Sequence, residues 1–289
     1  MNSRLKPLKI LPFEQYKKKA VDHTESKTIE TNLAHQELNF TETAKDAISQ
    51  IMKFHKLRRE DETYIVTTSD SPFVSSCVTS TLFNFCKVSR VLTEKTKLIF
   101  VIHEFGIPCE KVESLYEIAQ ERNIPLVEDS AHSLTSKYKG EHLGKHGDYL
   151  IHSLPKTLPI KTGGLVIKTS DRFKCEFVQS EKVKKDFYNN LNYLSFSHQE
   201  RIRQYKMYES LINKDLIYDK SDEVCPFCFG YIDTIDNVNK VYRIAQKKHI
   251  EILKTYNKNW VTIPLNPWYS ENDINRILKL IGDIEINES

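Results

Sequence analysis

Residues 96–130 of this 289-residue chain read TKLIFVIHEFGIPCEKVESLYEIAQERNIPLVEDS, and this stretch decides the fold class. Residues 96–106 begin with a continuous apolar run rich in β-forming side chains, which predicts a strand covered on both faces. Residues 111–123 have helical periodicity, and residues 124–130 form the next predicted strand. A strand, a helix and a strand within about thirty residues indicate a parallel βαβ unit in a doubly wound α/β sheet.

Segments on both sides extend this pattern. Residues 39–57 (NFTETAKDAISQIMKFHKL) carry apolar side chains near helical spacing behind threonines that can cap a helix, and residues 62–68 (ETYIVTT) predict a strand. After the βαβ unit, residues 147–153 (GDYLIHS) and 163–169 (GGLVIKT) are two more expected strands. In such a sheet we expect ligands at the carboxyl ends of the strands.

The character of the sequence changes near residue 180. Residues 181–212 are charged, rich in tyrosine and without glycine, and they predict mostly helix. Beyond them, short apolar segments alternate with amphipathic helical segments. We therefore predict a large cofactor-binding α/β domain over residues 1–180 and a small C-terminal α+β domain over residues 181–289.

The charge and composition exclude several classes of protein. The sequence contains 42 basic and 39 acidic residues, and this near balance argues against a dedicated nucleic-acid-binding protein. No apolar stretch reaches the roughly 18 residues of a membrane span, and residues 1–20 lack the apolar core of a leader, so we expect a cytoplasmic protein. The six cysteines are scattered, and reduced thiols are the default in a chain of this size.

Six of the eight glycines lie between residues 106 and 164. Glycine permits tight turns and a close approach of backbone to ligand, so this window is the candidate functional site. Within it, Lys156 stands between two prolines in HSLPKTLPIKTGG, residues 152–164. A desolvated lysine becomes a nucleophile that condenses with carbonyls, although most lysines are solvated surface charges.

Asp129 supplies a second part of this candidate site. It ends a predicted strand, where a carboxylate can cap a turn or form an ion pair, but where it can also hold a protonated pyridine nitrogen. An aspartate on the ring nitrogen and a Schiff-base lysine are the protein's part of pyridoxal-phosphate chemistry. Asp129 and Lys156 together are therefore more informative than either residue alone.

The motifs in residues 98–171 resemble those of the DegT/DnrJ/StrS-type sugar aminotransferases. VIHEFG, LVEDSAHS, the glycine-spaced turn YKGEHLGKHGDYL, the lysine segment and the glycine pair follow one another in the order of that family. The resemblance implies the fold of type I pyridoxal-phosphate transferases, with a mostly parallel sheet, helices on both faces and a small C-terminal α+β domain. It also implies pyridoxal 5′-phosphate as the cofactor.

The resemblance assigns roles to three residues of this window. Lys156 would be the Schiff-base lysine, Asp129 would pair with the pyridine nitrogen, and His132 would lie near the phenolic oxygen of the ring. Lys161 is the rival lysine. We prefer Lys156 because the seven-residue step from it to Gly163 matches the family spacing.

Three further residues would complete the cofactor site by the same resemblance. Ser153 would contact the phosphate, and Thr43 with the amides of the helix behind it would replace the glycine-bearing turn of the family. Phe73 matches an aromatic residue that stacks on the cofactor ring, and plain core packing is equally open for it. We expect no metal: CPFC at residues 225–228 has zinc-knuckle spacing, but no second pair completes it, and a buried apolar strand is the better interpretation.

Other features depart from the family pattern or have two interpretations. The stretch between SSCVTSTLFNF and TEKTKLIF is short, so we expect a strand and its connection to be missing. The asparagine and arginine motif that reaches the partner subunit is not recognisable near Asn190 or Asn192. His103 and Glu104 end a predicted strand and are equally a backbone-bonded pair or a substrate contact.

The sequence therefore predicts a pyridoxal-phosphate-dependent aminotransferase, a shortened member of the family. Its substrates would be a nucleotide-linked keto sugar and an amino donor, glutamate, in polysaccharide or deoxy-aminosugar biosynthesis. The alternative is a non-catalytic descendant that serves as a binding or assembly subunit. We also expect a homodimer, with Tyr188, Tyr193 and Phe196 at the interface.

Overall fold

The computed structural model describes residues 7–9, 36–71, 76–212, 224–254 and 259–285. Its contacts divide the chain into two compact units, which are described separately. The sheet unit holds the described residues from Gln36 to Ser195, with Val224 and Cys225, and the C-terminal unit holds the others.

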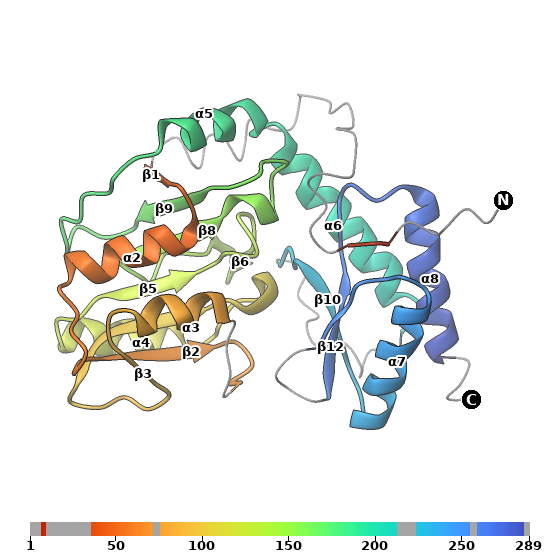
Figure 1. Ribbon diagram of the computed structural model, residues 1–289, viewed down its shortest axis with the longest axis horizontal. Coiled ribbons are helices and arrows are strands. Elements are labelled where there is room, and N and C mark those ends of the chain that lie inside the picture. Colours follow the sequence, from red (N-terminus) through yellow and green to blue (C-terminus); the bar gives the residue numbers. More distant parts are fainter. Residues whose placement is uncertain (1–6, 10–35, 72–75, 213–223, 255–258, 286–289) are drawn as a thin grey trace. The chain divides into compact units, whose positions relative to one another are not determined.

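A seven-stranded sheet forms the centre of the sheet unit (Figure 1). Its strands lie in the order β1 (Glu37–Thr41), β9 (Gly164–Lys168), β8 (Tyr149–Ser153), β5 (Leu126–Asp129), β4 (Thr96–Ile102), β2 (Glu62–Thr67) and β3 (Lys87–Ser89). The strands from β8 to β3 are parallel, whereas β9 is antiparallel to both of its neighbours. The predicted mostly parallel sheet is confirmed, but the strand β1 and its antiparallel pairing were not predicted.

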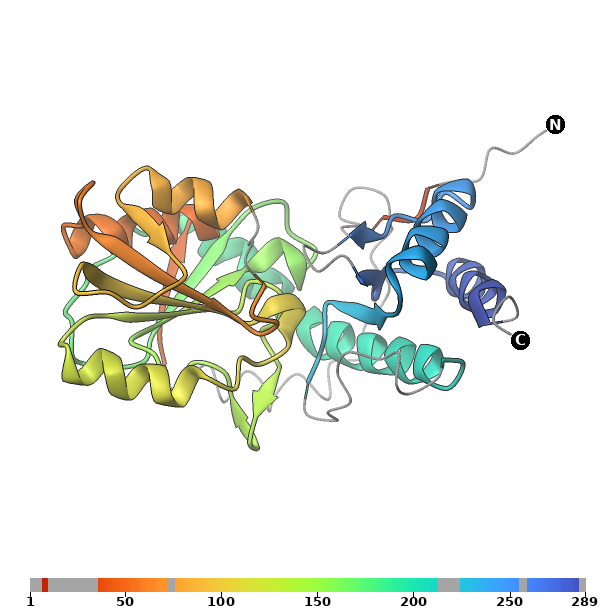
Figure 2. The same cartoon turned by 90° about the horizontal axis from the view of Figure 1, so that it is seen from below.

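Helices cover both faces of this sheet, as predicted. The helices α2 (Ala44–Phe54) and α3 (Ser76–Phe83) pack on the face that carries Phe100 and Ile151. The helix α4 (Val112–Glu121) packs on the opposite face, as Figure 2 shows, and α5 (Glu181–Asn190) covers that same face over β1 and β9. The predicted βαβ unit is therefore present as β4, α4 and β5.

The strand that we expected to be missing is present, so that expectation was wrong. The strand β3 is three residues long and pairs in parallel with β2. The short part is its connection to β4, which consists of residues 90–95 alone. A crossover between parallel strands usually takes a dozen or more residues and a helix. The chain is thus shortened in a connection, and the sheet keeps its strand.

The C-terminal unit contains a three-stranded antiparallel sheet in the order β10 (Cys228–Ile232), β12 (Trp260–Pro264) and β11 (Leu253–Lys254). Its helices are α7 (Ile235–Lys247), α8 (Glu271–Glu285) and the part of α6 (Tyr193–Glu209) that begins at Phe196. A core of aliphatic and aromatic side chains fills this unit. No helix in the described part of the chain is long and apolar enough to cross a membrane.

Two sequence-based expectations concern this part of the chain. The CPFC segment enters the sheet at Cys228, both cysteines are buried, and the described residues contain no cluster of three potential metal ligands. The helix α5 belongs by its contacts to the sheet unit, although it follows residue 180. The domain boundary near residue 180 stays a prediction.

Candidate functional site

The carboxyl ends of β4, β5 and β8 meet at one edge of the sheet, where open α/β sheets bind their ligands. Ile102 at the end of β4 lies beside Asp129 of β5, and Asp129 lies beside Ile151 of β8. Lys156 ends the short 3-10 helix η2 (Leu154–Lys156), which follows β8 directly. The fold therefore brings Asp129 and Lys156 to the same edge.

Asp129 is buried at this edge, with 5% of its surface exposed. Its Oδ1 accepts a hydrogen bond of 2.8 Å from the Ala131 amide, and this is the carboxylate's one hydrogen bond within the described part of the chain. Burial raises the pKa of Asp129 above its usual value, although the positive charge of Lys156 opposes this shift. Such a carboxylate is suited to a cationic partner.

Lys156 is half-buried, and its Nζ lies 3.0 Å from Nε2 of His132. Pro155 stands at the start of η2 and restricts the backbone that carries the lysine. Lys161, the rival lysine in the sequence, is exposed to solvent. The structure thus places Lys156 and His132 together beside the carboxylate of Asp129, and Lys161 in a different environment.

Glu128 precedes Asp129 in β5, so its side chain lies on the opposite face of the sheet, the face of α4. Its carboxylate accepts hydrogen bonds from Nε2–H of His103 at 2.9 Å and from the amides of residues 144, 146 and 147. Burial by itself would raise the pKa of Glu128, but these donors hold it below its usual value. Glu128 thereby anchors the glycine-spaced turn.

His103 and Glu104 are held within the chain. His103 is fully buried, and its Nδ1 accepts a hydrogen bond of 3.0 Å from the Cys109 amide, so both ring nitrogens are engaged. Glu104 accepts a hydrogen bond of 2.7 Å from the Ser69 amide. The sequence left open whether this pair is bonded within the chain or contacts a substrate. For His103, the contacts within the chain describe the structure.

The start of α2 and the glycine pair approach each other closely. Thr43 caps α2, because its Oγ1 accepts a hydrogen bond of 3.0 Å from the Asp46 amide. A Cβ placed on Gly164 would lie 2.4 Å from Oγ1 of Thr41 and 2.6 Å from the backbone of Thr43. Ser153 is the register partner of Gly164 on its other side. The two expected phosphate contacts, Thr43 and Ser153, therefore flank Gly164.

The remaining predicted residues are distributed as follows. Phe73 lies outside the described residues. Asn190 is buried, and its side-chain amide donates a hydrogen bond of 2.7 Å to the Asp186 carbonyl within α5. Tyr188 is 54% exposed, whereas the Phe196 ring packs 5.3 Å from the ring of Trp268. The homodimer and its interface stay predictions.

Sequence reasoning missed Phe105, which lies directly against the candidate site. Its ring stacks on the ring of His132 with the centroids 5.5 Å apart. The signal available was an aromatic residue placed immediately before Gly106 at the end of a predicted strand. Its importance depends on its contact with the ring of His132, which only folding creates.

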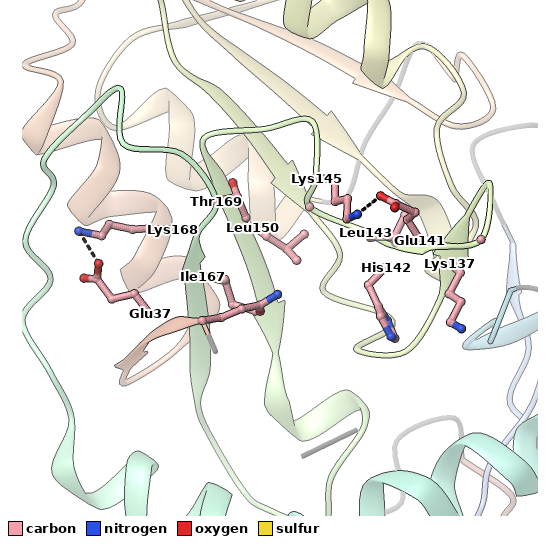
Figure 3. A pocket seen from close by; sticks show the side chains of 13 residues that line it. Glu37, Lys137, Glu141, His142, Leu143, Lys145, Leu150, Ile167, Lys168 and Thr169 are labelled. Atoms are coloured by element: carbon pink, nitrogen blue, oxygen red, sulfur yellow. Dashed lines mark ion pairs between the residues drawn. The ribbon is translucent and has the colours of Figure 1, made fainter. Parts of the chain in front are cut away.

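A pocket of about 590 Å³ lies elsewhere on the sheet unit (Figure 3). Leu150 and Ile167 line it from β8 and β9, together with the hairpin of β6 (Lys137–Tyr138) and β7 (Glu141–His142). Ion pairs of Lys145 with Glu141 and of Lys168 with Glu37 stand among its charged residues. None of the predicted site residues lines this pocket.

Comparisons with known proteins bear on the family and on the fold. The model of the DegT/DnrJ/EryC1/StrS aminotransferase family matches residues 30–204, more than half of the chain. GDP-perosamine synthase of Escherichia coli O157:H7 is 38% identical over 87 residues, which cover 29% of this chain and 23% of that protein. The matches span about a quarter of the length of the curated relatives.

Solved structures share the fold over nearly the whole chain. PseC of Helicobacter pylori, an aminotransferase involved in the biosynthesis of pseudoaminic acid, has a TM-score of 0.70 at 13% identity, covering 96% of this chain and 95% of its own. NtdA of Bacillus subtilis with bound cofactor PMP also has a TM-score of 0.70, at 14% identity, covering 95% of this chain and 79% of its own. The predicted fold class and family are confirmed.

Proposed function

Because the chain belongs to the DegT/DnrJ/EryC1/StrS aminotransferase family, we propose that it is a pyridoxal-phosphate-dependent aminotransferase acting on a keto sugar. One observation carries the proposal. The buried carboxylate of Asp129 has one hydrogen bond within the described residues, and it shares a sheet edge with the pair formed by Lys156 and His132. A carboxylate, an amine and an imidazole in this arrangement can bind a cationic aromatic ring that bears a carbonyl group.

The residues at this edge fit pyridoxal 5′-phosphate. Asp129 would hold the pyridine nitrogen, since its raised pKa reflects a buried charge without a full set of partners. Thr43 and Ser153 would hold the phosphate on the two sides of Gly164, where the start of α2 supplies free amides. When bound, the cofactor supplies an electron sink for the carbanion formed on the substrate.

The side chains have separate tasks in this proposal. Asp129 keeps a proton on the ring nitrogen, because an ionised carboxylate beside it favours the charged form of that nitrogen. Lys156 would be the residue that holds the cofactor through its Nζ, and its free amine would then hold and move a proton at Nζ. His132 accepts a hydrogen bond from the Lys156 ammonium when the site is without substrate.

The substrate class is proposed from the relatives. GDP-perosamine synthase carries a nucleotide in the name of its product, and a match at 38% identity covers part of this chain. A nucleotide-linked keto sugar as acceptor and glutamate as amino donor are therefore the substrates that we propose, in a homodimeric enzyme. Polysaccharide or deoxy-aminosugar biosynthesis is the corresponding role.

Cofactor attachment tests the proposal. The protein incubated with pyridoxal 5′-phosphate should develop visible absorbance that borohydride bleaches, and peptide mass mapping should place the reduced adduct on Lys156. Lys156→Ala should abolish the absorbance because it removes the only amine at this edge that the described residues place beside Asp129. The matched control Lys161→Ala should retain it, since Lys161 is exposed.

Other results would contradict the proposal. An adduct on Lys161 would overturn the assignment of the lysine. Absence of absorbance and of any adduct in the wild-type protein would instead favour the second candidate, a non-catalytic binding or assembly subunit. That candidate has one observation in its favour, the unrecognisable asparagine and arginine motif after the glycine pair.

A further inference from the structure

Phe105 has an unfavourable backbone conformation beside the candidate site. It lies in the short 3-10 helix η1 (Glu104–Gly106) with φ 55° and ψ 19°, in the left-handed region. A residue with a side chain adopts this conformation less favourably than the right-handed one. Glycine would adopt it without that cost, so the phenylalanine ring itself requires an explanation.

Contacts on both sides of Phe105 hold the backbone in place. Before it, the Glu104 carboxylate accepts the Ser69 amide proton at 2.7 Å, and His103 is fixed at both ring nitrogens. After it, the carbonyl of Gly106 accepts a hydrogen bond of 2.7 Å from the Ser136 hydroxyl. These contacts over-determine the turn, which is the condition under which local strain persists.

The constrained turn directs the Phe105 ring onto His132. The two ring planes are inclined by 28° with centroids 5.5 Å apart, within the range of stacked aromatic pairs. On the same imidazole, Nε2 lies 3.0 Å from Nζ of Lys156. The Phe105 ring thus covers one face of the His132 imidazole, and the Lys156 amine lies at the edge of that imidazole.

We propose that Phe105 is a positioning residue that fixes the imidazole of His132 with Nε2 directed at Nζ of Lys156. The χ2 torsion of histidine is broad, so a free imidazole would sample many orientations. A stacked ring restricts rotation out of its plane and keeps water from one face of the hydrogen bond. The geometric part of this inference stands alone, and its value for catalysis rests on the proposed function.

Plain core packing does not account for Phe105 equally well. Its side chain is half-buried and does not belong to the buried clusters that fill the sheet unit. A residue needed only for packing could occupy a position with ordinary backbone angles. Here an aromatic ring occurs at a position where the backbone favours glycine.

Two substitutions separate the ring from the backbone. Phe105→Gly removes the ring and relieves the left-handed strain, so the midpoint of thermal unfolding should stay equal or rise. Phe105→Tyr keeps an aromatic face and should behave as the wild type. In Phe105→Gly, the imidazole of His132 should lose its fixed orientation although the midpoint of thermal unfolding is unchanged or higher. A merely structural role for Phe105 would not give this combination.

Both readouts use the cofactor-free protein. The first is the NMR spectrum of the His132 imidazole, whose resonances are assigned with the variant His132→Gln. The ring-current shift that Phe105 causes in these resonances should vanish in Phe105→Gly and remain in Phe105→Tyr. The second is the acetylation rate of Lys156 relative to Lys161, measured by peptide mass spectrometry. This ratio should rise about fivefold in Phe105→Gly, the order expected when an ammonium loses one hydrogen bond.

The outcomes distinguish this inference from the proposed function. Unchanged His132 resonances or an unchanged acetylation ratio in Phe105→Gly would overturn the positioning role, whatever the protein does with pyridoxal phosphate. If both readouts change as expected while the wild-type protein binds no pyridoxal phosphate, the positioning role stands and the proposed function fails.

Discussion

Glu128 and Asp129 are neighbours in β5 and both are buried, but the two faces of the sheet surround them differently. Glu128 accepts hydrogen bonds from His103 and from three amides of the turn at residues 144–147, and these donors lower its pKa. Within the described residues, Asp129 accepts one hydrogen bond, from the Ala131 amide, and burial raises its pKa.

This difference separates a carboxylate that is held by several donors from one that our proposed function assigns to a ligand. A buried charge with a full set of donors stabilises the turn that it holds, and its removal leaves those donors unsatisfied. A buried charge with few partners makes the empty site less stable than it could be, and a cationic ligand can supply the missing partner. The two positions are adjacent, so the strand alone does not set their roles.

The largest expected effect comes from Glu128→Gln. The amide is isosteric with the carboxylate, but its NH2 group would face donors, so the free energy of unfolding should fall by about 3 kcal/mol. Urea denaturation of the cofactor-free protein measures this change, with the exposed Glu110→Gln as the matched control. A loss no greater than that of the control would show that the turn does not depend on Glu128.

Gly164→Ala tests the close approach on the Asp129 side of the comparison. A Cβ would lie 2.4 Å from Oγ1 of Thr41, so the start of α2 must shift, at a cost of about 2 kcal/mol in the free energy of unfolding. Affinity for pyridoxal phosphate should also fall, because Thr43 moves with that helix end. Gly282→Ala is the control, since its added Cβ would meet no atom within 4 Å other than the neighbouring backbone of its own helix. Equal unfolding free energies in the two variants would contradict the close packing.

Asp129→Asn should have the smallest effect on stability, and the effect has the opposite sign. Removal of a buried charge with one hydrogen bond should raise the free energy of unfolding of the cofactor-free protein by about 1 kcal/mol. The variant should still accept pyridoxal phosphate, but turnover should fall strongly, because an amide cannot stabilise a protonated ring nitrogen. Urea denaturation and a steady-state transamination assay measure the two changes.

The pH dependence sharpens this last comparison. The pKa of Asp129 is raised in the folded protein, so its contribution to stability is complete below the usual aspartate pKa of about 3.9 and is lost as the pH rises through the folded-state value. The advantage of Asp129→Asn should therefore be absent in acid and grow with pH. The exposed Asp171→Asn should show no such trend. A constant advantage would mean that Asp129 does not carry a buried charge.

The sequence predicted the elements with strong periodicity more successfully than the short ones. The continuous apolar run at the start of residues 96–130 identified β4 because every residue of its centre is buried between two layers of helices. The strand β3 was missed because three residues, of which two are polar or charged, carry no periodicity. The strand β1 was missed for a related reason, since its pairing partner β9 is distant along the chain.

The candidate site shows the same division. Asp129 and Lys156 were predicted as site residues from the sequence and His132 from the family resemblance, and the structure brings the three together at one edge. The roles of Glu128 and Phe105 were not identified, because each depends on partners that are brought near by folding. Their residue types alone, a glutamate and a phenylalanine, have many uses in a protein.

The sequence by itself determined the α/β class, the family and the residues whose chemistry suits pyridoxal phosphate, because periodicity and motif spacing are local properties of the chain. Only the tertiary structure decided which of two adjacent carboxylates is held by several donors and which has a single donor among the described residues. The physical reason is that the partners of a buried group come from segments far along the chain. The hydrogen bonds from these partners and the removal of water together set the charge of the buried group and its contribution to the free energy of unfolding.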